Sequence, residues 1–289
     1  MKKITLLFVM ILSTVSYSQT PITDANFQLA INTCLSTNPV DGMCSDSEYG
    51  AIPDWDVSNV TNMEYAFLYK ENFNADISNW DVSNVTNMYY MFNNSSSFNG
   101  DISSWDVSNV TTMEAMFGEA REFNQDISSW NVRGVTDMSV MFYNADNFNQ
   151  DISGWDVSSV IHMGYMFYNA STFNQDISSW DVSNVTDMDY MFLEALAFNQ
   201  NISGWCVTNI SEEPTDFSID SPLIESNKPV WGTCPTASVD DQNQLDISIY
   251  PNPTSDIVNV DGNYSQLKVV VYDILGKQVM KESITNSID

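Results

Sequence analysis

Basic residues are scarce in this chain. Only 9 of its 289 residues are Lys or Arg, whereas 38 are Asp or Glu, so the formal net charge at pH 7 is −29. A surface this acidic repels nucleic acids and anionic lipid headgroups, and it tolerates or attracts cations. The shortage of Lys and Arg therefore argues against nucleic acid or a membrane surface as a partner, although such charge also serves solubility alone.

Histidine is almost absent, since His162 is the only one in the chain. It occupies a place in a repeated unit that Asn, Asp or Thr holds elsewhere, and its neighbours Ile161 and Met163 are residues typical of a core. We interpret it as drift within a repeat and not as a metal ligand or a catalytic base. Phosphate-binding glycine loops, zinc-ligand spacings and separate acid/base carboxylate pairs are missing too, so we expect no enzymatic activity.

Apolar runs long enough to span a bilayer are also missing. The run Ile4–Val15 has about twelve residues, whereas a membrane helix needs roughly 20. Lys2 and Lys3 precede this run, and the Ser-Tyr-Ser at 16–18 fits a small-x-small cleavage site. Residues 1–18 are therefore predicted to be a secretory signal peptide, and the exported chain is expected to have no membrane span.

Cysteine is rare, with 4 residues in the whole chain. In an exported protein four cysteines suggest two disulfides, for which three pairings are possible. Position along the chain favours Cys34 with Cys44 and Cys206 with Cys234. The first pair would staple the segment before the repeats described next, and the second would staple the segment after them.

Repetition, in contrast, is abundant. Seven tryptophans follow one another at intervals of 25 residues, and around each lies a near-copy of F-N-Q-D-I-S-x-W-D-V-S-N-V-T-N-M-x-x-M-F. A unit of this length cannot bury its own apolar face, so copies are predicted to stack with Trp, Met and Phe in one shared interior. The tryptophans of the series are Trp55, Trp80, Trp105, Trp130, Trp155, Trp180 and Trp205.

Within one unit the apolar periodicity changes once. Around the Trp, apolar Ile, Trp and Val are separated by polar residues, which is typical of a short strand with one buried face. Met88, Met91 and Phe92 then follow at helical spacing, and a Thr two residues before the first Met could cap a helix there. The predicted fold is therefore an α/β repeat solenoid, leucine-rich-repeat-like, with one short strand and one short helix per 25-residue coil.

Polar residues recur as strictly as the apolar ones. In a stack, repeated Asn and Ser can satisfy backbone groups between coils, whereas a column of Asp repels itself unless solvent screens it or cations lie between the carboxylates. Calcium is the plausible cation because it prefers carboxylate and amide oxygens, although no segment carries a complete calcium loop. The candidate metal ligands are Asp76, Asp101, Asp126, Asp151 and Asp176.

The variable positions, where a partner could be recognised, follow the first Met of each predicted helix. Tyr recurs four times at the second of these positions, and exposed tyrosines suit contact with proteins or glycans. Alternatively, these side chains only cover the solvent side of the helices. The candidate binding residues are Tyr65, Tyr90, Tyr165 and Tyr190.

The unit Phe173–Phe192, F-N-Q-D-I-S-S-W-D-V-S-N-V-T-D-M-D-Y-M-F, resembles the 25-residue unit of BspA-like leucine-rich-repeat surface proteins. The resemblance covers the chain from about Trp55 to Trp205. It implies a secreted or cell-surface protein that binds a host, matrix or neighbouring-cell protein or glycan, with adhesion as the purpose. The alternatives are a structural spacer with no specific ligand and a non-catalytic appendage of a longer protein.

The composition changes after Cys234. I-Y-P-N-P-T at 249–254 and V-V-V-Y-D-I-L-G-K at 269–277 resemble the C-terminal sorting domain of type IX secretion, which implies the secretion machinery as a partner. That family continues with a G-x-Y-x-x-x-I stretch and a basic tail, and this sequence stops at Asp289 without them. We therefore expect a partial sorting domain.

Together these patterns predict five segments. Residues 1–18 form the signal peptide, 19–50 an N-terminal cap and 51–210 the repeat solenoid. Residues 211–238 form a C-terminal cap and linker, and 239–289 a partial sorting domain made of a small β segment.

Overall fold

The computed structural model of this protein describes residues 19–235 and four strands between 247 and 285. The predicted signal peptide, residues 1–18, lies outside the described residues. So do residues 236–246, which hold the end of the predicted cap and linker (211–238) and the start of the predicted sorting domain. The chain divides into two compact units, Met1–Pro235 and Thr236–Asp289. In the described part of the chain, no helix has both the length and the apolar character that crossing a bilayer requires.

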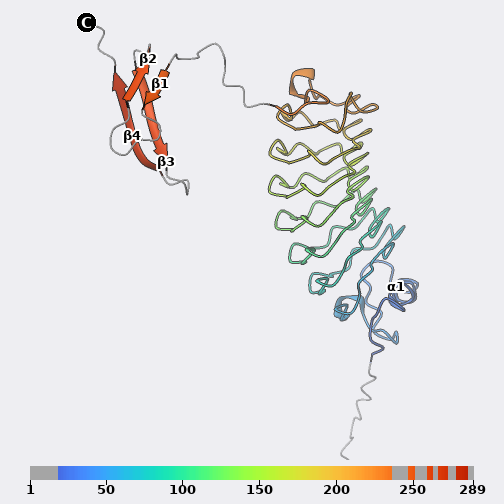
Figure 1. Ribbon diagram of the computed structural model, residues 1–289. Helices are drawn as coiled ribbons and strands as arrows, with labels where there is room; N and C mark the ends of the chain where they lie inside the picture. The colour runs from blue at the N-terminus through green and yellow to red at the C-terminus, as the bar shows by residue number, and fades with distance from the viewer. Residues whose placement is uncertain (1–18, 236–246, 251–258, 263–265, 273–277, 286–289) are drawn as a thin grey trace, which may run out of the picture. The chain divides into compact units, whose positions relative to one another are not determined.

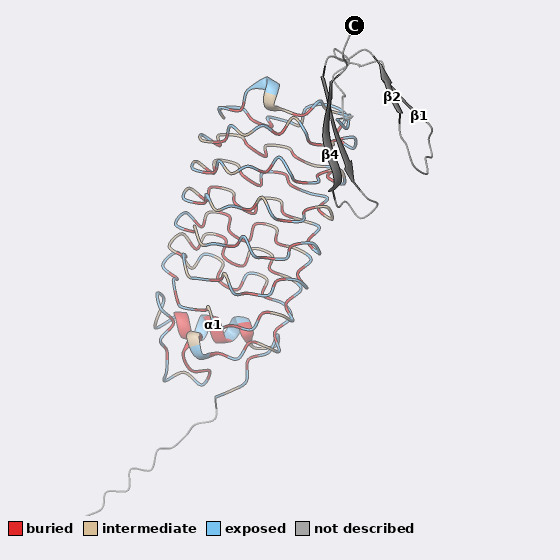
Figure 2. Ribbon diagram, turned by 90° about the vertical axis from the view of Figure 1, so that its left-hand side faces the viewer, coloured by how far each residue is buried: buried red, intermediate tan, exposed pale blue. Residues whose placement is uncertain are grey.

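The first unit is a stack of similar coils that lie side by side (Figure 1). Buried and exposed residues alternate along every coil (Figure 2), so each coil contributes one edge to a common interior. A column of isolated parallel β-bridges joins each coil to the next. The bridged residues are Asn62, Asn87, Thr112, Asp137, His162 and Asp187.

The α/β fold predicted from the sequence is wrong. Residues 55–210, all of them described, contain neither a strand nor an α-helix, and their backbone runs through turns and isolated bridges. Within residues 19–235 the regular elements are one α-helix and two 3₁₀ helices: α1 (Phe27–Leu35), η1 (Ile52–Asp54) and η2 (Glu225–Asn227). The leucine-rich-repeat architecture therefore has no support in the coils.

The Met and Phe residues that were predicted to form a helix lie in a run of consecutive turns instead. In the second coil the Met91 N–H donates to the Met88 carbonyl, which closes one turn, while the N–H groups of Tyr90 and Phe92 donate to the next coil. Tyr90 and Asn94 have positive φ values of 54° and 57°. These left-handed residues send alternate N–H groups along the stack, whereas a helix of two turns would leave most of its terminal groups unpaired.

We call this eight-residue stretch of successive turns the turn ribbon. Each of the first six coils has one that begins at the first Met of the repeated unit. The six ribbons are residues 63–70, 88–95, 113–120, 138–145, 163–170 and 188–195.

The alternation around each Trp also comes from turns. The Trp80 N–H donates to the Ile77 carbonyl and the Val85 N–H to the Val82 carbonyl, so two tight turns flank the indole. Each turn keeps its apolar ends in the core and exposes the polar residues between them. Alternation of this kind mimics a strand in sequence, but the backbone changes direction twice within it.

The shared interior predicted from the repeats is confirmed. The seven tryptophans of the series are 1–5% exposed. From the second coil onward each indole N–H donates to an Ile carbonyl of the preceding coil, as Trp105 does to Ile77 at 3.1 Å. Phenylalanines stack in the same way, with Phe92 lying 3.9 Å from Phe98 in its own coil and 5.7 Å from Phe117 in the next, centroid to centroid.

The predicted disulfide pairing is confirmed as well. The structure joins Cys34 to Cys44 and Cys206 to Cys234, and it leaves no free cysteine among the described residues. Cys34 lies on the buried face of α1, and the helix packs Phe27 edge-on against Trp55 and Trp80.

The carboxylate of Asp24 completes the N-terminal end of the stack. In later coils the N–H of a Thr donates to the Thr carbonyl one coil back, as Thr86 does to Thr61. The first coil has no coil before it, and the Asp24 carboxylate accepts the N–H groups of Thr61 and Asn62 at 2.8 and 3.1 Å instead. One side chain thus stands in for a missing coil.

Replacing Asp24 by Ala is expected to lower the free energy of unfolding by about 1–2 kcal/mol, because two backbone N–H groups lose their acceptor. Asp24→Asn retains one acceptor oxygen and should lose less. Urea denaturation at pH 7 measures both changes. The control is Asp54→Ala, at an exposed residue of η1; an equal loss in that control would contradict the role of Asp24.

In the part of the second unit that the structure describes, four antiparallel strands form two pairs. Strand β1 (Ile247–Tyr250) pairs with β2 (Asn259–Gly262), and β3 (Gln266–Tyr272) pairs with β4 (Gln278–Thr285). The Y-P-N-P motif begins at the last residue of β1, and V-V-V-Y lies within β3.

Candidate functional site

The outer side of the turn ribbons carries the variable residues of the repeats. In the first ribbon the outward positions are Glu64, Tyr65, Leu68 and Tyr69, and the second and fourth of these have positive φ. Backbone hydrogen bonds join every ribbon to the next, so equivalent positions lie in columns along the stack. We call this surface the ribbon face.

Three tyrosines gather near the N-terminal end of the ribbon face. The ring of Tyr65 lies 5.2 Å from that of Tyr89 and 5.8 Å from that of Tyr90, and the last two rings are 4.4 Å apart. Tyr65 is 39% exposed, so its ring remains open to a partner. We call these residues the N-terminal tyrosine cluster.

Four more tyrosines gather further along the same face. Tyr165 stacks on Tyr190 at 4.5 Å, Tyr143 stacks on Tyr168 at 4.8 Å, and the rings of Tyr165 and Tyr168 are 6.0 Å apart. These contacts link residues from three consecutive coils into one aromatic surface. We call it the C-terminal tyrosine cluster.

The four tyrosines predicted from the sequence thus occupy one column but belong to two clusters. The third ribbon separates them, because its equivalent positions hold half-buried Glu114 and Glu119 and buried Ala115 and Gly118, none of which is aromatic. Tyr143 and Tyr168 belong to the second cluster although no role was predicted for them. Each lies three residues after the variable position of its ribbon, a spacing that also places two side chains on one side of a helix, so the sequence did contain a signal for them.

Burial raises the pKa of four of the clustered tyrosines, Tyr89, Tyr90, Tyr165 and Tyr168. Desolvation is the main cause for Tyr89, with its hydrogen bond to Tyr65 next, and desolvation followed by the charge of Glu114 raises the pKa of Tyr90. Desolvation and the nearby Tyr190 do the same for Tyr165. The hydroxyl groups of these four tyrosines therefore stay protonated at neutral pH and can both donate and accept hydrogen bonds.

Carboxylates and amides surround the tyrosine rings. Asn87 donates to the Glu64 carboxylate at 2.9 Å beside the first cluster, and Asp189 lies next to Tyr190 in the second. Glu114 lies in the third ribbon, and its pKa is raised by burial and by the charge of the neighbouring Asp137. A face of this kind offers flat apolar rings with hydrogen-bond acceptors at their edges, which suits sugars and polypeptides.

Two hollows lie along this side of the stack. One, of about 540 Å³, lies between α1 and the first ribbon, where Tyr65, Glu64 and Lys70 line it. The other, of about 400 Å³, lies beyond the sixth ribbon and is lined by Asp187 and Asp189 among others. Tyr65 of the N-terminal tyrosine cluster thus lines the first hollow, into which part of a ligand could extend, whereas the lining of the second contains no tyrosine.

The repeated Asp residues predicted as metal ligands lie in turns elsewhere on the coil. Asp101 accepts the N–H of Ser103 at 2.9 Å and its hydroxyl at 2.7 Å, and each of the other four accepts the N–H of the Ser two residues on. A side chain that bonds the backbone two residues ahead is an Asx turn, so local folding accounts for the Asp and Ser columns. The D-x-S spacing was the sequence signal for this role.

Those hydrogen bonds outweigh the repulsion between neighbouring carboxylates. The backbone and hydroxyl groups of Ser103 lower the pKa of Asp101, whereas Asp76 and Asp126 raise it by less. No group of three or more His, Cys, Asp or Glu residues in the described part of the chain is placed to hold a metal ion. Calcium binding stays a prediction, and thermal melting with and without a chelator tests it; a midpoint that the chelator does not move would remove it.

We expect the stability of the stack to fall on acidification. A carboxylate with a lowered pKa contributes stability above its unfolded pKa of about 3.9 and loses it as the pH falls through the folded value. Acid also relieves repulsion within a chain of charge −29, which acts in the opposite direction, so urea titrations from pH 7 to 2 should be run in high salt. The carboxylates with lowered pKa are Asp24, Asp56, Asp76, Asp101, Asp106, Asp126, Asp151, Asp156 and Asp176.

The expected curve is flat above about pH 5 and falls below pH 4. Ser103→Ala removes the hydroxyl that bonds Asp101, so it should make this fall slightly smaller. Stability that rises between pH 4.5 and 2.5 in high salt would contradict the role given to the Asx turns.

Two family descriptions match the chain. "Mycoplasma protein of unknown function, DUF285" matches residues 41–146 and 126–222, which include all six turn ribbons. "Secretion system C-terminal sorting domain" matches residues 248–289, which include the three strands β2 to β4 and nearly all of β1. Neither description names a leucine-rich repeat. No curated protein and no solved structure matches the chain.

Proposed function

This chain belongs to the family DUF285, and from that premise we propose that it is a non-enzymatic adhesion protein whose ribbon face binds a protein or glycan. Its sorting domain makes it a secreted or cell-surface protein, with a tail that fits handling by the type IX secretion machinery. The ribbon face is then presented outside the cell, where host, matrix and neighbouring-cell molecules are the available partners.

The observation that carries the proposal is that tyrosines recur at positions whose backbone is left-handed, a conformation that is unfavourable for bulky side chains. The second outward position of all six ribbons has a φ between 53° and 62°, and four of the six residues there are Tyr. A left-handed conformation costs a bulky residue roughly 1 kcal/mol, and Gly or Asn adopts it more easily. Stability therefore does not explain the tyrosines, and a role at the surface does.

The arrangement also bears on the spacer alternative. A spacer would need no more than soluble side chains on its outer face, and tyrosines scattered at random would serve as well. Here seven tyrosines lie in two clusters on one face, and Tyr65 of the first cluster lines a hollow. This supports specific contact over a stalk without a ligand.

The test is a screen of the full chain against arrays of glycans and extracellular-matrix proteins. In the two variants Tyr65→Asn/Tyr90→Asn and Tyr165→Asn/Tyr190→Asn, Asn is tolerated at positive φ, so the ribbon should keep its fold. We expect the variant in the ligand-bearing cluster to bind at least tenfold more weakly, because interface tyrosines commonly carry about 2 kcal/mol or more.

Gly154→Ser is the matched control, because Gly154 lies off the ribbon face with no atom within 4 Å of an added Cβ. It should bind as the native chain does. If a ligand found in the screen binds both double variants unchanged while their melting midpoints are native, the ribbon face is not the adhesion surface.

A further inference from the structure

The stack ends in a seventh ribbon, residues 214–221, that lacks the repeated Met-x-x-Met-Phe sequence. It keeps the ribbon geometry, since Asp216 and Asp220 have positive φ values of 46° and 57°. Its carbonyl groups accept N–H groups from the sixth ribbon, as every earlier ribbon does from the one before. The donor–acceptor pairs are Tyr190 with Thr215, Phe192 with Phe217 and Glu194 with Ile219, each at 2.8 Å.

The outward edge of this last ribbon is a row of backbone N–H groups. In earlier ribbons the equivalent donors bond to the next coil, and here they belong to Asp216, Ser218 and Asp220. None of the three has an acceptor among the residues that the structure describes. Ser218 is only 8% exposed, and a buried N–H group without a partner is costly, so the edge is suited to an incoming acceptor.

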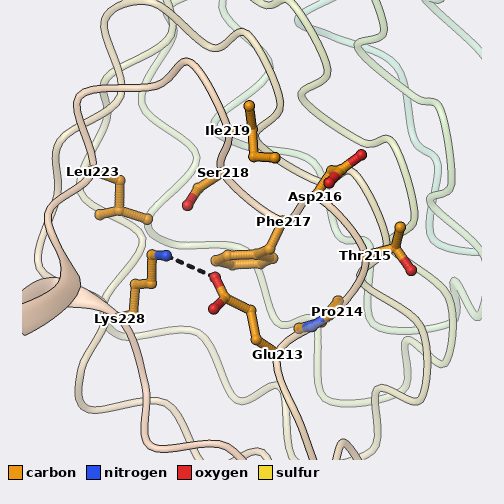
Figure 3. Close-up of a pocket in the computed structure, with 9 residues that line it drawn as sticks. All are labelled: Glu213, Pro214, Thr215, Asp216, Phe217, Ser218, Ile219, Leu223 and Lys228. Atoms are coloured by element: carbon orange, nitrogen blue, oxygen red, sulfur yellow. Dashed lines mark hydrogen bonds and ion pairs between the residues drawn. The ribbon is translucent and has the colours of Figure 1, made fainter.

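A hollow of about 520 Å³ lies against this edge (Figure 3). Phe217, Ile219 and Leu223 give it apolar walls, and Lys228 stands across from Glu213. The Lys228 ammonium already pairs with Glu213 at 2.7 Å and with Glu225 at 3.1 Å. The cation is thus neutralised, and the exposed carboxylates of Asp216 and Asp220 leave the rim acidic.

The two ends of the stack differ in how they are closed. At the N-terminal end α1 packs against the first coil, and Asp24 accepts its free N–H groups. At the C-terminal end, the segment after the seventh ribbon contains only η2, and Ile219, Ile224 and Val230 are 51%, 55% and 70% exposed. Only the C-terminal end therefore combines a free donor row with apolar surface.

We propose that this end of the stack docks an extended, basic segment of a partner protein, which adds one further rung. An extended backbone presents carbonyl groups on one side at every second residue, as the alternating donors Asp216, Ser218 and Asp220 require. An apolar side chain of the segment enters the hollow, and Lys or Arg side chains meet the acidic rim.

A second copy of this chain fits the end less well. Its N-terminal end is covered by α1, and its C-terminal end carries the same acidic rim, so two such ends repel each other. The seventh ribbon is next to Tyr190 of the C-terminal tyrosine cluster, whose N–H donates to the Thr215 carbonyl, but the proposed segment bonds backbone N–H groups and not tyrosine rings. The two proposals are therefore separated by their readouts: protection of the amides of Asp216, Ser218 and Asp220 tests this one, and loss of binding in the tyrosine variants tests adhesion.

The experiment uses the full chain and a ten-residue peptide of alternating Lys and Val, with a Glu–Val peptide of the same length as comparison. Residue-resolved amide hydrogen exchange reads the three N–H groups directly. We expect the Lys–Val peptide, but not the Glu–Val peptide, to slow exchange at Asp216, Ser218 and Asp220 at least tenfold.

Charge reversal locates the binding. Asp216→Lys/Asp220→Lys should raise the dissociation constant of the Lys–Val peptide at least tenfold, because both carboxylates of the rim change sign. Asp54→Lys/Glu71→Lys makes the same change in net charge at exposed residues near the other end, and it should leave the constant within twofold.

Three results would overturn the proposal. The first is no protection of the three amides with bound peptide, and the second is equal weakening by both charge reversals. The third is protection of those amides before peptide is added, which would mean that this chain or a second copy already occupies the edge; light scattering would then tell the two apart.

Discussion

Replacing Trp130 by Ala is expected to lower the free energy of unfolding by about 3–5 kcal/mol, the range for removing a large aromatic side chain from a core. Trp130 lies in the middle of the stack and is 4% exposed. Its indole packs 6.2 Å from the Phe117 ring and donates to the Ile102 carbonyl at 3.2 Å. The change removes the packing and the hydrogen bond together and leaves a buried carbonyl without its donor.

Trp130→Phe separates these two contributions. Phe keeps most of the apolar area, but it cannot donate to Ile102, so we expect a loss of about 1–2 kcal/mol. Trp205→Ala provides the positional control, because the last Trp of the series has a regular coil on one side only. Each coil of a repeat stack is stabilised mainly by its two neighbours. A destabilised central coil therefore weakens the coupling between the two halves of the stack, whereas a destabilised terminal coil only reduces the number of coils that unfold together.

Urea denaturation followed by tryptophan fluorescence measures the three variants. Trp130→Ala should also broaden the transition or divide it into two, because the halves on either side lose part of their coupling. A loss below about 1 kcal/mol for Trp130→Ala would contradict the shared interior, since a packed indole cannot be removed at so small a cost.

The interior could be predicted from the sequence because burial follows from repetition alone. Trp130 has six equivalents at a constant interval, and any stack with that period brings them together, whatever the backbone does between them. The same holds for Cys34 and Cys44, whose short separation and position before the repeats favoured their pairing. These predictions needed only the period and the chain order.

The backbone itself could not be predicted in this way. Met88, Met91 and Phe92 share a spacing that a helix and a run of turns both produce, and side-chain periodicity does not distinguish them. The deciding feature is the left-handed conformation of Tyr90 and Asn94, and Tyr gives no sequence signal for it because bulky residues rarely adopt it. Hydrogen bonds between coils stabilise that conformation, and they exist only once the stack has formed.

For the candidate site, too, the sequence predicted what repeats but not what depends on the backbone. The column of Tyr65, Tyr90, Tyr165 and Tyr190 was visible because it repeats, but its division into two clusters depends on which other residues turn outward. The Asp column was visible too, and the D-x-S spacing accounts for its repetition, because each carboxylate accepts the N–H of the Ser two residues on. Calcium binding at this column stays a prediction that the chelator experiment tests.

The second large effect is expected from the Cys34–Cys44 disulfide. The double variant Cys34→Ala/Cys44→Ala should lower the free energy of unfolding by about 3 kcal/mol through the added chain entropy of the unfolded state. Both sulfurs lie in the core, where Cys34 is fully buried and Cys44 is 7% exposed. The bridge fixes α1, and α1 places Phe27 over the first two tryptophans.

Losing the Cys34–Cys44 bridge should therefore also raise solvent access at the N-terminal end of the stack. Urea denaturation gives the change in stability, and fluorescence quenching by acrylamide gives the exposure of tryptophan. The control is Cys206→Ala/Cys234→Ala, which removes a bridge of longer separation, 28 residues against 10, at the opposite end. Chain entropy predicts a comparable loss there, about 3–4 kcal/mol, but without exposure of Trp55 and Trp80.

The comparison between the two pairs tests how the stack is closed. If α1 protects the first coil as its contacts indicate, only the N-terminal variant increases quenching in the folded state, and a further Trp55→Phe change removes most of that increase. Equal quenching in both variants would mean that the helix does not cover the first tryptophans. The stack would then depend on coil-to-coil contacts alone, and both of its ends, not only the C-terminal one, would be open to a partner.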